Sequence, residues 1–469
     1  MNFWNAAFNL PTGPLIFLAV ALFVAFIFEF INGFHDTANA VTAVIYTRSL
    51  RPTPAVVFSG VMNFLGALIN VLFLGAGVAF TIVNLLPVDL LVDARSNAAL
   101  VMVVSLLLAG VLWNLGTWYM GLPVSSSHTL IGCILGVGIA NGLWNKVGFE
   151  GVEWSAAVKV GIGLLVSPLI GFLFAGGLLL LMRLVLRQPR LYQSPQGEDK
   201  PPMWIRLMLI GTCGGVSFFH GSNDGQKGMG LLLLVLIGFL PAHYALTVND
   251  PEMAPKVLEG VREVRQLYAK HEYPVPEQLS KDLDFLEREL AGKASFEELP
   301  HGQDERWKIR QAIYRIVDLK KLKNDKSMPA ELKEDLKKVR SNRLADSIEY
   351  IPIWVVFCTA LALGIGTMIG YKRIVVTVAE KIGKTHLTYA QGAAAGAVTA
   401  GTILVADLTS LPVSTTQVLS SSVAGTMVAN RSGVQSGTCE KILLAWVLTL
   451  PVCMLLGGSL FALGRLFVG

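Results

Sequence analysis

The stretches NGFHDTANA (Asn32–Ala40) and GLPVSSSHTLIG (Gly121–Gly132) are polar segments in an apolar chain, and each occurs twice. Past the middle, the chain reads HGSNDGQKG at His220–Gly228 and then SLPVSTTQVLSS at Ser410–Ser421, in the same order. A polar element duplicated within hydrophobic sequence is typical of membrane transporters whose site lies between two related halves. The repeat therefore predicts a duplicated membrane protein with one central site.

The composition supports a membrane protein. The chain is 53% hydrophobic and only 15% charged, whereas soluble domains average about 25% charged residues. Apolar stretches that approach or exceed the length needed to cross a bilayer recur at 15–30, 56–83, 98–112, 160–186, 231–246, 351–371, 391–406 and 442–463. With the motif-bearing segments added, we predict an all-α polytopic membrane protein with roughly ten to twelve membrane elements.

Several classes of protein and site are not expected. The five cysteines are scattered without the spacing of a zinc site or a disulfide framework. The net charge of +5 is modest and the basic residues are interleaved with acids, so no nucleic-acid partner is predicted. No basic region precedes the first apolar run, which argues against a cleaved signal peptide. Because basic residues flank membrane segments in several loops, the positive-inside rule selects no orientation.

The spacing of the motifs predicts two copies and an insertion. Gly33 and Pro123 are 90 residues apart, whereas Gly221 and Pro412 are 191 apart. The second copy contains one long charged stretch with helical spacing, which accounts for the difference. We predict a first transmembrane repeat at 1–186, a polar linker at 187–203, the start of the second repeat at 204–247, a soluble charged helical insertion at 248–348 and the remainder of the second repeat at 349–469.

The hydroxyl triplets after Leu-Pro-Val predict an anion site. Proline suits the first turn of a helix, and Ser or Thr caps free backbone N–H groups. Such a helix start cannot face lipid, so it must point into a cavity, where its N–H groups and hydroxyls favour an anion. The candidate donors are Ser125, Ser126 and Ser127 in one half and Ser414, Thr415 and Thr416 in the other. The alternative is that the hydroxyls bond back to their own helices.

The other pair of motifs predicts a cation or proton site. Asp36 and Asp224 occupy equivalent positions, and an intramembrane carboxylate is a functional candidate by default. The flanking glycines permit a break in each helix, which would free backbone carbonyls as cation ligands. The fold is therefore expected to contain two repeats with broken or re-entrant helices.

Histidine and asparagine alternate between the copies. Asn32 aligns with His220, and His35 aligns with Asn223, so each half holds one of each beside its aspartate. Histidines next to carboxylates suit proton transfer, although a membrane histidine can also be a packing residue.

Further positions bear on coupling. Asn39 in the first copy corresponds to Lys227 in the second, and an ammonium group there makes the second site unsuited to Na⁺. Glu29, about two helical turns before Asp36, is a candidate proton relay or one partner of a buried pair. Gln417 stands where the first copy has His128, so a histidine at that position cannot act in both halves.

These residues resemble the inorganic phosphate transporter (PiT) family, whose mark is a duplicated Gly-x-x-Asp-x-x-Asn motif with Pro-Val-Ser-Thr-Thr-His downstream. The resemblance covers nearly the whole chain outside the insertion and is greatest to bacterial low-affinity Pit-type permeases. Further runs that carry it are WNLGTWY, FAGG, LALGIGTMIG and VLSSSVAGTMV. The sequence departs from the family pattern at His35, Lys227 and Gln417.

The resemblance implies that the two repeats are inverted around a central site. It also implies secondary active import of inorganic phosphate by alternating access in the cell (inner or plasma) membrane. It further implies proton coupling and transport of phosphate largely as a neutral complex with a divalent metal such as Mg²⁺. The expected partners are phosphate, protons, a divalent metal as co-substrate and membrane lipid, with a homodimer as one assembly to test. No resident cofactor is expected, and no metal ligands are assigned.

Three alternatives to proton-coupled phosphate import are compatible with parts of the sequence. A sodium-coupled phosphate permease or a proton-coupled sulfate permease would have the same fold. Carboxylates near the anion favour phosphate, because HPO₄²⁻ can donate a hydrogen bond and sulfate cannot. A hydrolase built on Ser127, His128 and Asp36 is disfavoured, since adjacent helical residues point about 100° apart and no Gly-x-Ser-x-Gly elbow is present. The chain is therefore expected not to be an enzyme.

Overall fold

The computed structural model describes residues 3–73, 75–83, 85, 97–146, 148–152, 154–195, 200–248, 250–299, 303–317 and 327–468. The described residues form helices joined by turns and loops, and their only β pairing is an isolated bridge between Gly383 and Val434. The prediction of an all-α protein is confirmed. The chain divides into two compact units, one formed mainly by 236–351 and the other by 17–90, 96–235 and 352–469.

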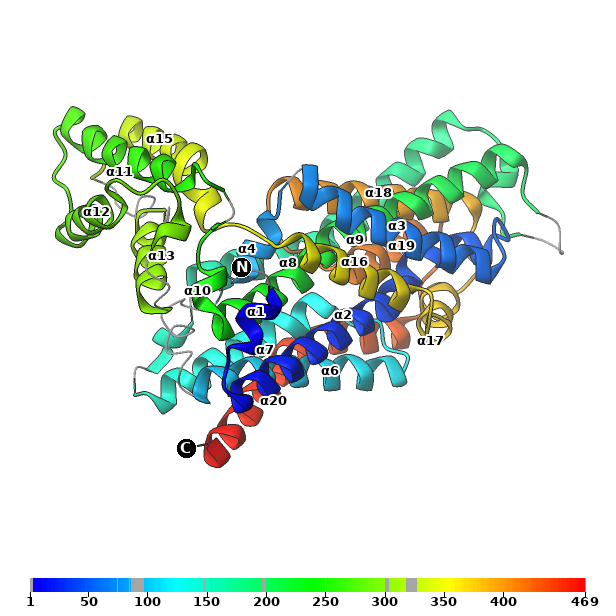
Figure 1. Ribbon diagram of the computed structural model, residues 1–469. Coiled ribbons are helices and arrows are strands. Elements are labelled where there is room, and N and C mark those ends of the chain that lie inside the picture. The colour runs from blue at the N-terminus through cyan, green and yellow to red at the C-terminus, as the bar shows by residue number, and fades with distance from the viewer. Residues whose placement is uncertain are drawn as a thin grey trace. The chain divides into compact units, whose positions relative to one another are not determined.

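The second unit is the transmembrane unit. Its helices are α2 (Thr12–Tyr46), α3 (Pro52–Phe73), α4 (Gly77–Val83), α6 (Asn97–Tyr119), α7 (Ser126–Trp144), α8 (Trp154–Val185), α9 (Met203–Phe239), α16 (Ile353–Thr367), α17 (Lys372–Val376), α18 (Tyr389–Leu408), α19 (Thr415–Ala429) and α20 (Ser436–Val468), with the short turns η1 (Gly148–Gly151), η2 (Pro189–Tyr192) and η6 (Thr377–Lys381) (Figure 1).

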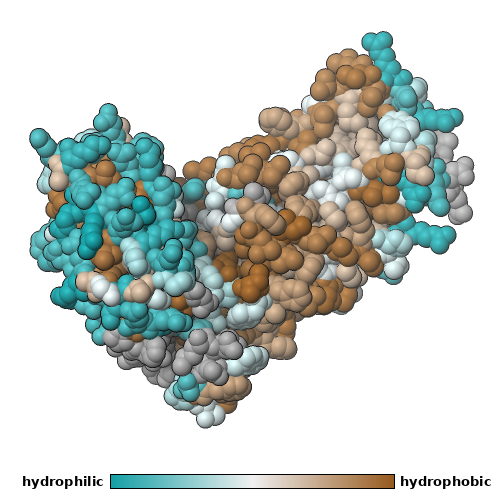
Figure 2. Space-filling model, turned by 45° about the horizontal axis from the view of Figure 1, so that its top comes forward, coloured by the Kyte–Doolittle hydropathy of each residue, from teal (hydrophilic) through white to brown (hydrophobic). Residues whose placement is uncertain are grey.

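Seven of these helices are long and apolar enough to cross a membrane by length and composition, within the described residues: α2, α3, α6, α7, α8, α18 and α20. α16 and α19 are shorter, at 15 residues each, and α9 carries the charged motif. Hydrophobic residues cover much of the surface of this unit in Figure 2. The chain is therefore a multi-pass membrane protein.

Helices from the two halves of the sequence pack against each other in matched pairs. α7 of the first half packs against α20 of the second, and α19 of the second half packs against α8 of the first. Within each half, α6 contacts α7 and α18 contacts α19. The two hydroxyl-rich helix starts thus belong to helices in equivalent settings.

The expected break in the aspartate-bearing helices is wrong. α2 and α9 run through their motifs without interruption, as helices of 35 and 37 residues. The glycines instead allow helices to approach closely. A Cβ added to Gly33 would lie 2.3 Å from the carbonyl oxygen of Leu363, and one added to Gly221 would lie 2.1 Å from that of Asn63. The chain is interrupted before α7 and α19, where Leu-Pro-Val precedes each helix start.

The first unit includes residues 236–351, which span the range 248–348 predicted for the charged insertion. Its helices are α1 (Phe3–Phe8), α10 (Pro241–Tyr244), α11 (Met253–Lys270), α12 (Glu277–Leu290), α13 (Gln303–Val317) and α15 (Ala330–Val339), with the turns η3 (Phe296–Glu298), η4 (Arg340–Leu344) and η5 (Ala345–Ser347). Its surface is largely hydrophilic in Figure 2. As expected from the helical spacing, apolar faces meet inside, where Tyr268, Phe296 and Leu286 are buried.

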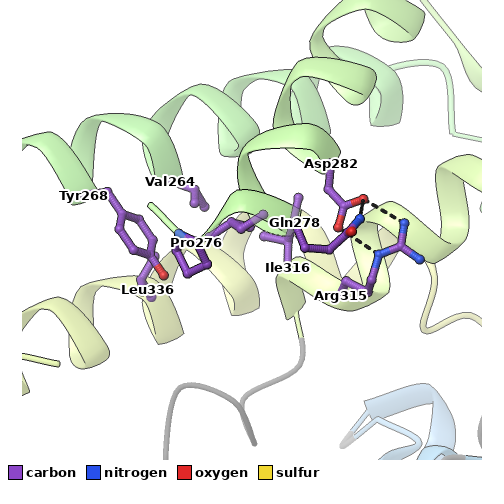
Figure 3. A pocket seen from close by; sticks show the side chains of 9 residues that line it. Val264, Tyr268, Pro276, Gln278, Asp282, Arg315, Ile316 and Leu336 are labelled. Atoms are coloured by element: carbon purple, nitrogen blue, oxygen red, sulfur yellow. Dashed lines mark hydrogen bonds and ion pairs between the residues drawn. The ribbon is translucent and has the colours of Figure 1, made fainter. Parts of the chain in front are cut away.

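A small cavity of about 100 Å³ lies between α11, α12, α13 and α15 (Figure 3). At its edge Arg315 donates two hydrogen bonds to the buried carboxylate of Asp282, at 2.8 Å from Nε and 2.7 Å from Nη2. Gln278 donates a third hydrogen bond to Asp282, at 3.2 Å. A buried carboxylate requires such partners.

Candidate functional site

Asp36 lies at the meeting point of both halves. It sits on α2 and is 3% exposed. Thr416 Oγ1, in the first turn of α19, donates to Asp36 Oδ1, and Ser126 Oγ, in the first turn of α7, donates to Oδ2 at 3.4 Å. Both predicted hydroxyl triplets therefore reach one carboxylate.

Asp224 is paired with a lysine in an oxygen-lined cage. Lys227 Nζ lies 2.6 Å from Asp224 Oδ1, 2.7 Å from Ser127 Oγ and 2.8 Å from the carbonyl oxygen of Val413. Ser127 also donates to that carbonyl at 2.9 Å. Lys227 is 3% exposed, so its ammonium group is compensated by these oxygens. The cage contains groups from α7, α9 and the turn before α19.

His220 lies between the two aspartates. Its Nε2 is 3.5 Å from Asp36 Oδ2 and 3.5 Å from Asp224 Oδ2. Its Nδ1 is 2.6 Å from Asn63 Oδ1, and Asn63 Nδ2 donates to Thr367 Oγ1 at 3.2 Å. Because Asn63 presents its oxygen, Nδ1 carries the proton and a neutral His220 directs the lone pair of Nε2 at two carboxylates.

That arrangement needs a cation. Nε2 of His220 makes no hydrogen bond within the described structure, and a lone pair facing two carboxylates is repelled. Asp36, His220 and Asp224 present atoms within 4.8 Å of one another, close enough to share one cation. A proton on Nε2 would convert the repulsion into attraction to both carboxylates.

The hydroxyl groups of the two triplets have different partners. Ser125 Oγ accepts from the backbone N–H of His128 at 3.1 Å, and Ser414 Oγ accepts from that of Gln417 at 3.2 Å. These two residues are N-caps, so the alternative of bonding back to the helix holds for them. Thr415 Oγ1 is buried and has no hydrogen-bond partner among the described residues.

The remaining predicted residues lie around this centre. His35 Nδ1 is 3.6 Å from Asp36 Oδ1, and the ring is fully buried. Glu29 is fully buried. Its Oε1 accepts a hydrogen bond from Asn32 at 3.5 Å, and its Oε2 lies 2.2 Å from the position that a Cβ on Gly228 would take. Asn39 lies on α2, but its side chain is outside the described residues.

The side-chain amide of Asn223 is bonded to another carboxylate, that of Asp407. Its Nδ2 donates to Asp407 Oδ1 at 2.6 Å, and the other oxygen of Asp407 accepts from Ser222 and from Asn70, the latter at 3.3 Å. Sequence reasoning missed Asp407 and Asn63. Asp407 directly follows the apolar run 391–406. The rule that membrane carboxylates are functional candidates would therefore have identified it. Asn63 carries no such signal.

Comparisons with known proteins identify the family of the chain. Residues 32–457 match the sequence profile of the phosphate transporter family. The chain belongs to the phosphate transporter family. That membership places it among transporters, not among enzymes.

Relatives in the phosphate transporter family align over almost the whole chain. Low-affinity inorganic phosphate transporter PitA of Escherichia coli (strain K12) is 42% identical, with 99% of each chain covered. PitB of the same strain is 41% identical, with 97% of each covered. A solved structure titled "The sodium-dependent phosphate transporter" has a TM-score of 0.61 and 19% identity, covering 96% of this chain and 99% of that one. This last likeness concerns the fold.

Proposed function

We propose that the chain is a symporter that imports inorganic phosphate across the cell (inner) membrane, driven by protons through alternating access. It works without a resident cofactor, and the charged insertion at 248–348 is a separate domain of the second repeat. Family membership supports phosphate as the substrate. The observations that support the finer statements concern the sealed site between α2, α7, α9 and α19.

The phosphate is proposed to bind between the starts of α7 and α19. Both helix starts carry free backbone N–H groups, which favour an anion. Ser126 and Thr416 are buried beside Asp36, and the hydroxyl of Thr415 is available. An HPO₄²⁻ ion can donate a hydrogen bond to a carboxylate such as Asp36, whereas sulfate cannot. This supports phosphate over sulfate.

The proposed coupling to protons, and not to Na⁺, rests on Lys227, because its ammonium group fills the oxygen cage beside Asp224. Hard cations such as Na⁺ bind in cages of carboxylate, hydroxyl and carbonyl oxygens. At Asp224 that cage already holds the ammonium of Lys227, with three oxygens within 2.8 Å. A second cation there would meet the charge of Lys227. Coupling must then use another ion at another atom.

Nε2 of His220 is the proposed carrier of the coupled proton. The charged or titratable groups that face it are Asp36, Asp224, Glu29, Lys227 and His35. A proton on Nε2 would join the two carboxylates. Its release would leave them repelling each other and would favour opening of the site.

The transported species is proposed to be a complex of phosphate with a divalent metal. Asp36 and Asp224 are both buried within the site, and a bare dianion would be repelled by two carboxylates. A neutral complex of HPO₄²⁻ and a divalent cation avoids much of this cost. The metal enters as part of the substrate.

Phosphate-induced proton movement tests the proposal. Adding phosphate and Mg²⁺ to lightly buffered proteoliposomes should raise the external pH as protons enter. His220→Asn, which places the residue of the equivalent first-half position, should abolish the pH change. Glu259→Gln, in the charged insertion, is the matched control and should behave like wild type. Phosphate entry with no proton movement in the wild type would contradict proton symport.

A further inference from the structure

Glycine residues form matching helix contacts in the two halves of the chain. Gly33 of α2 packs against the carbonyl of Leu363 on α16, and Gly221 of α9 packs against that of Asn63 on α3. Three residues further on, Gly366 of α16 packs against the carbonyl of Phe30, and Gly66 of α3 packs against that of Phe218. Reciprocal contacts of this kind are produced by a two-fold axis. Asn63 is therefore equivalent to Leu363.

The same contacts give the direction of the helices. Ser59 bonds Ser217 at 2.8 Å, and further along both helices Ala67 meets Gly225, so α3 and α9 run parallel. α2 and α3 are joined by only five residues, 47–51, which makes them antiparallel neighbours. It follows that α2 and α9 run in opposite directions (Figure 1). Equivalent positions of the two halves then face opposite sides of the membrane.

Two aromatic side chains pack together beside the first aspartate motif. Phe34, next to Gly33, packs edge-on against Trp118, with ring centroids 5.1 Å apart. Trp118 Nε1 donates to the carbonyl of Gly370 at 2.9 Å, and Gly370 lies over the ring of Phe34. We call Phe34, Trp118 and Gly370 the aromatic cluster. It joins α2, α6 and the end of α16.

The same positions of the other half form a polar cluster. Ser222 follows Gly221 as Phe34 follows Gly33; Asp407 and Trp118 each lie five residues before the proline of Leu-Pro-Val; Asn70 lies seven residues after Asn63, as Gly370 does after Leu363. Asp407 accepts from Ser222 and Asn70, and Asn70 donates to Ser222. We call Ser222, Asp407 and Asn70 the acidic cluster.

We propose that the aromatic cluster and the acidic cluster are the two gates of the transport path, on opposite sides of the central site. This rests on the proposed alternating access. Each cluster joins three helices next to an aspartate motif, and the residues between them are nearly inaccessible, at 3% exposure or less for Asp36, Asp224 and Lys227. The outer members Trp118 and Asp407 are half-buried, at the boundary of the sealed site.

The two gates differ in what they let pass. The aromatic gate closes by ring packing and carries no charge. The acidic gate presents a carboxylate, which repels a bare phosphate anion and accepts a cation or a phosphate paired with one. Asp407 therefore makes passage on its side dependent on an accompanying cation. The two gates differ because the position that holds Trp118 in the first half holds Asp407 in the second.

The sidedness of access to the centre tests the gates. Thr415→Cys, in a protein whose five native cysteines are replaced by serine or alanine, puts a reporter thiol in the sealed site. Its labelling by a membrane-impermeant reagent is followed in right-side-out and inside-out vesicles. Asp407→Ala should speed labelling from one side by about tenfold, the effect of losing a hydrogen bond to a charged group. Trp118→Ala should speed it from the opposite side.

Matched controls lie on the same helices. Val405→Ala on α18 and Leu115→Ala on α6 shorten exposed side chains and should leave labelling unchanged. Ser222→Ala and Trp118→Phe are milder variants that should act in the same directions if the alanine variants misfold. Acceleration from one common side, or none, would overturn the proposal. Failure of phosphate to protect the thiol would contradict the phosphate site, while opposite-sided acceleration would still support the gates.

Discussion

The hydroxyl of Thr416 donates a hydrogen bond to the carboxylate of Asp36, across 380 positions of sequence and between the two halves of the chain. The reciprocal contact joins Lys227, three residues after the equivalent aspartate, to Ser127, the residue equivalent to Thr416. The helix starts proposed to bind the anion and the motifs proposed to hold the cation are thus connected across the halves. Binding of one ion must therefore affect the groups that bind the other.

Asp36→Asn should strongly reduce proton-coupled phosphate uptake. The amide keeps the shape, but the site loses the negative charge that faces His220 at 3.5 Å. Loss of a charge-assisted contact predicts a fall of about tenfold to hundredfold in coupled uptake. Labelled phosphate uptake under a pH gradient measures it, with Asp284→Asn in the exposed part of the insertion as the control. Full coupled uptake by Asp36→Asn would remove this residue from the mechanism.

Lys227→Asn should make uptake respond to Na⁺. The substitution installs the residue that the first motif has at the equivalent position, Asn39, and vacates the oxygen cage beside Asp224. An amide oxygen, a carboxylate, a hydroxyl and a carbonyl then remain for a hard cation. Uptake compared in Na⁺ and choline media is the measurement. Equal uptake in both media would show that Lys227 does not exclude Na⁺.

Gly221→Ala should cost far more function than Gly211→Ala on the same helix. A Cβ at Gly221 would lie 2.1 Å from the carbonyl oxygen of Asn63, whereas nothing lies within 4 Å of one at Gly211. Relief of the overlap would separate α3 from α9 and disturb the bond between Asn63 and His220, at about 1–3 kcal/mol for overpacking. Thermal stability and uptake of both variants decide it. Equal behaviour would contradict the close approach.

Glu349→Gln should stabilise the insertion at neutral pH. Burial raises the pKa of the Glu349 carboxyl, against the opposing influence of Arg340 and Arg310, and Asp346 adds to the rise. Since the folded pKa exceeds the unfolded one, the stabilising contribution is full at low pH and is lost as pH rises through the folded value. The variant should therefore gain over wild type near pH 7 and lose that gain near pH 4.

Hydrogen exchange of α13 and α15, corrected for the intrinsic rate at each pH, measures this difference. The control is Glu331→Gln, at the exposed start of α15. A gain that is the same at both pH values would mean that the ionisation of Glu349 does not govern it.

The sequence predicted the centre of the site because its signals are local. Asp36 and Asp224 are acidic residues in apolar helices, and the hydroxyl residues after Leu-Pro-Val predict helix starts. The structure brings Asp36, Asp224, Ser126 and Thr416 together as those signals suggested. What the motif spacing could not give was the partner of each hydroxyl, which depends on packing between helices.

Two features were beyond sequence reasoning for physical reasons. Glycine permits both a helix break and a close helix contact, and only the position of Leu363 and Asn63 shows that contact is the outcome here. The tautomer of His220 depends on Asn63, a polar residue in an apolar helix whose partner lies 157 positions away. Such partners become visible only when the helices are packed.

The most direct test of proton-driven phosphate symport is uptake of labelled phosphate into proteoliposomes under an imposed pH gradient, with and without Na⁺ and Mg²⁺. We predict uptake that requires the gradient, is indifferent to Na⁺ and rises with Mg²⁺, as expected from the ammonium of Lys227 in the oxygen cage. Uptake that follows Na⁺ and ignores the pH gradient would contradict it.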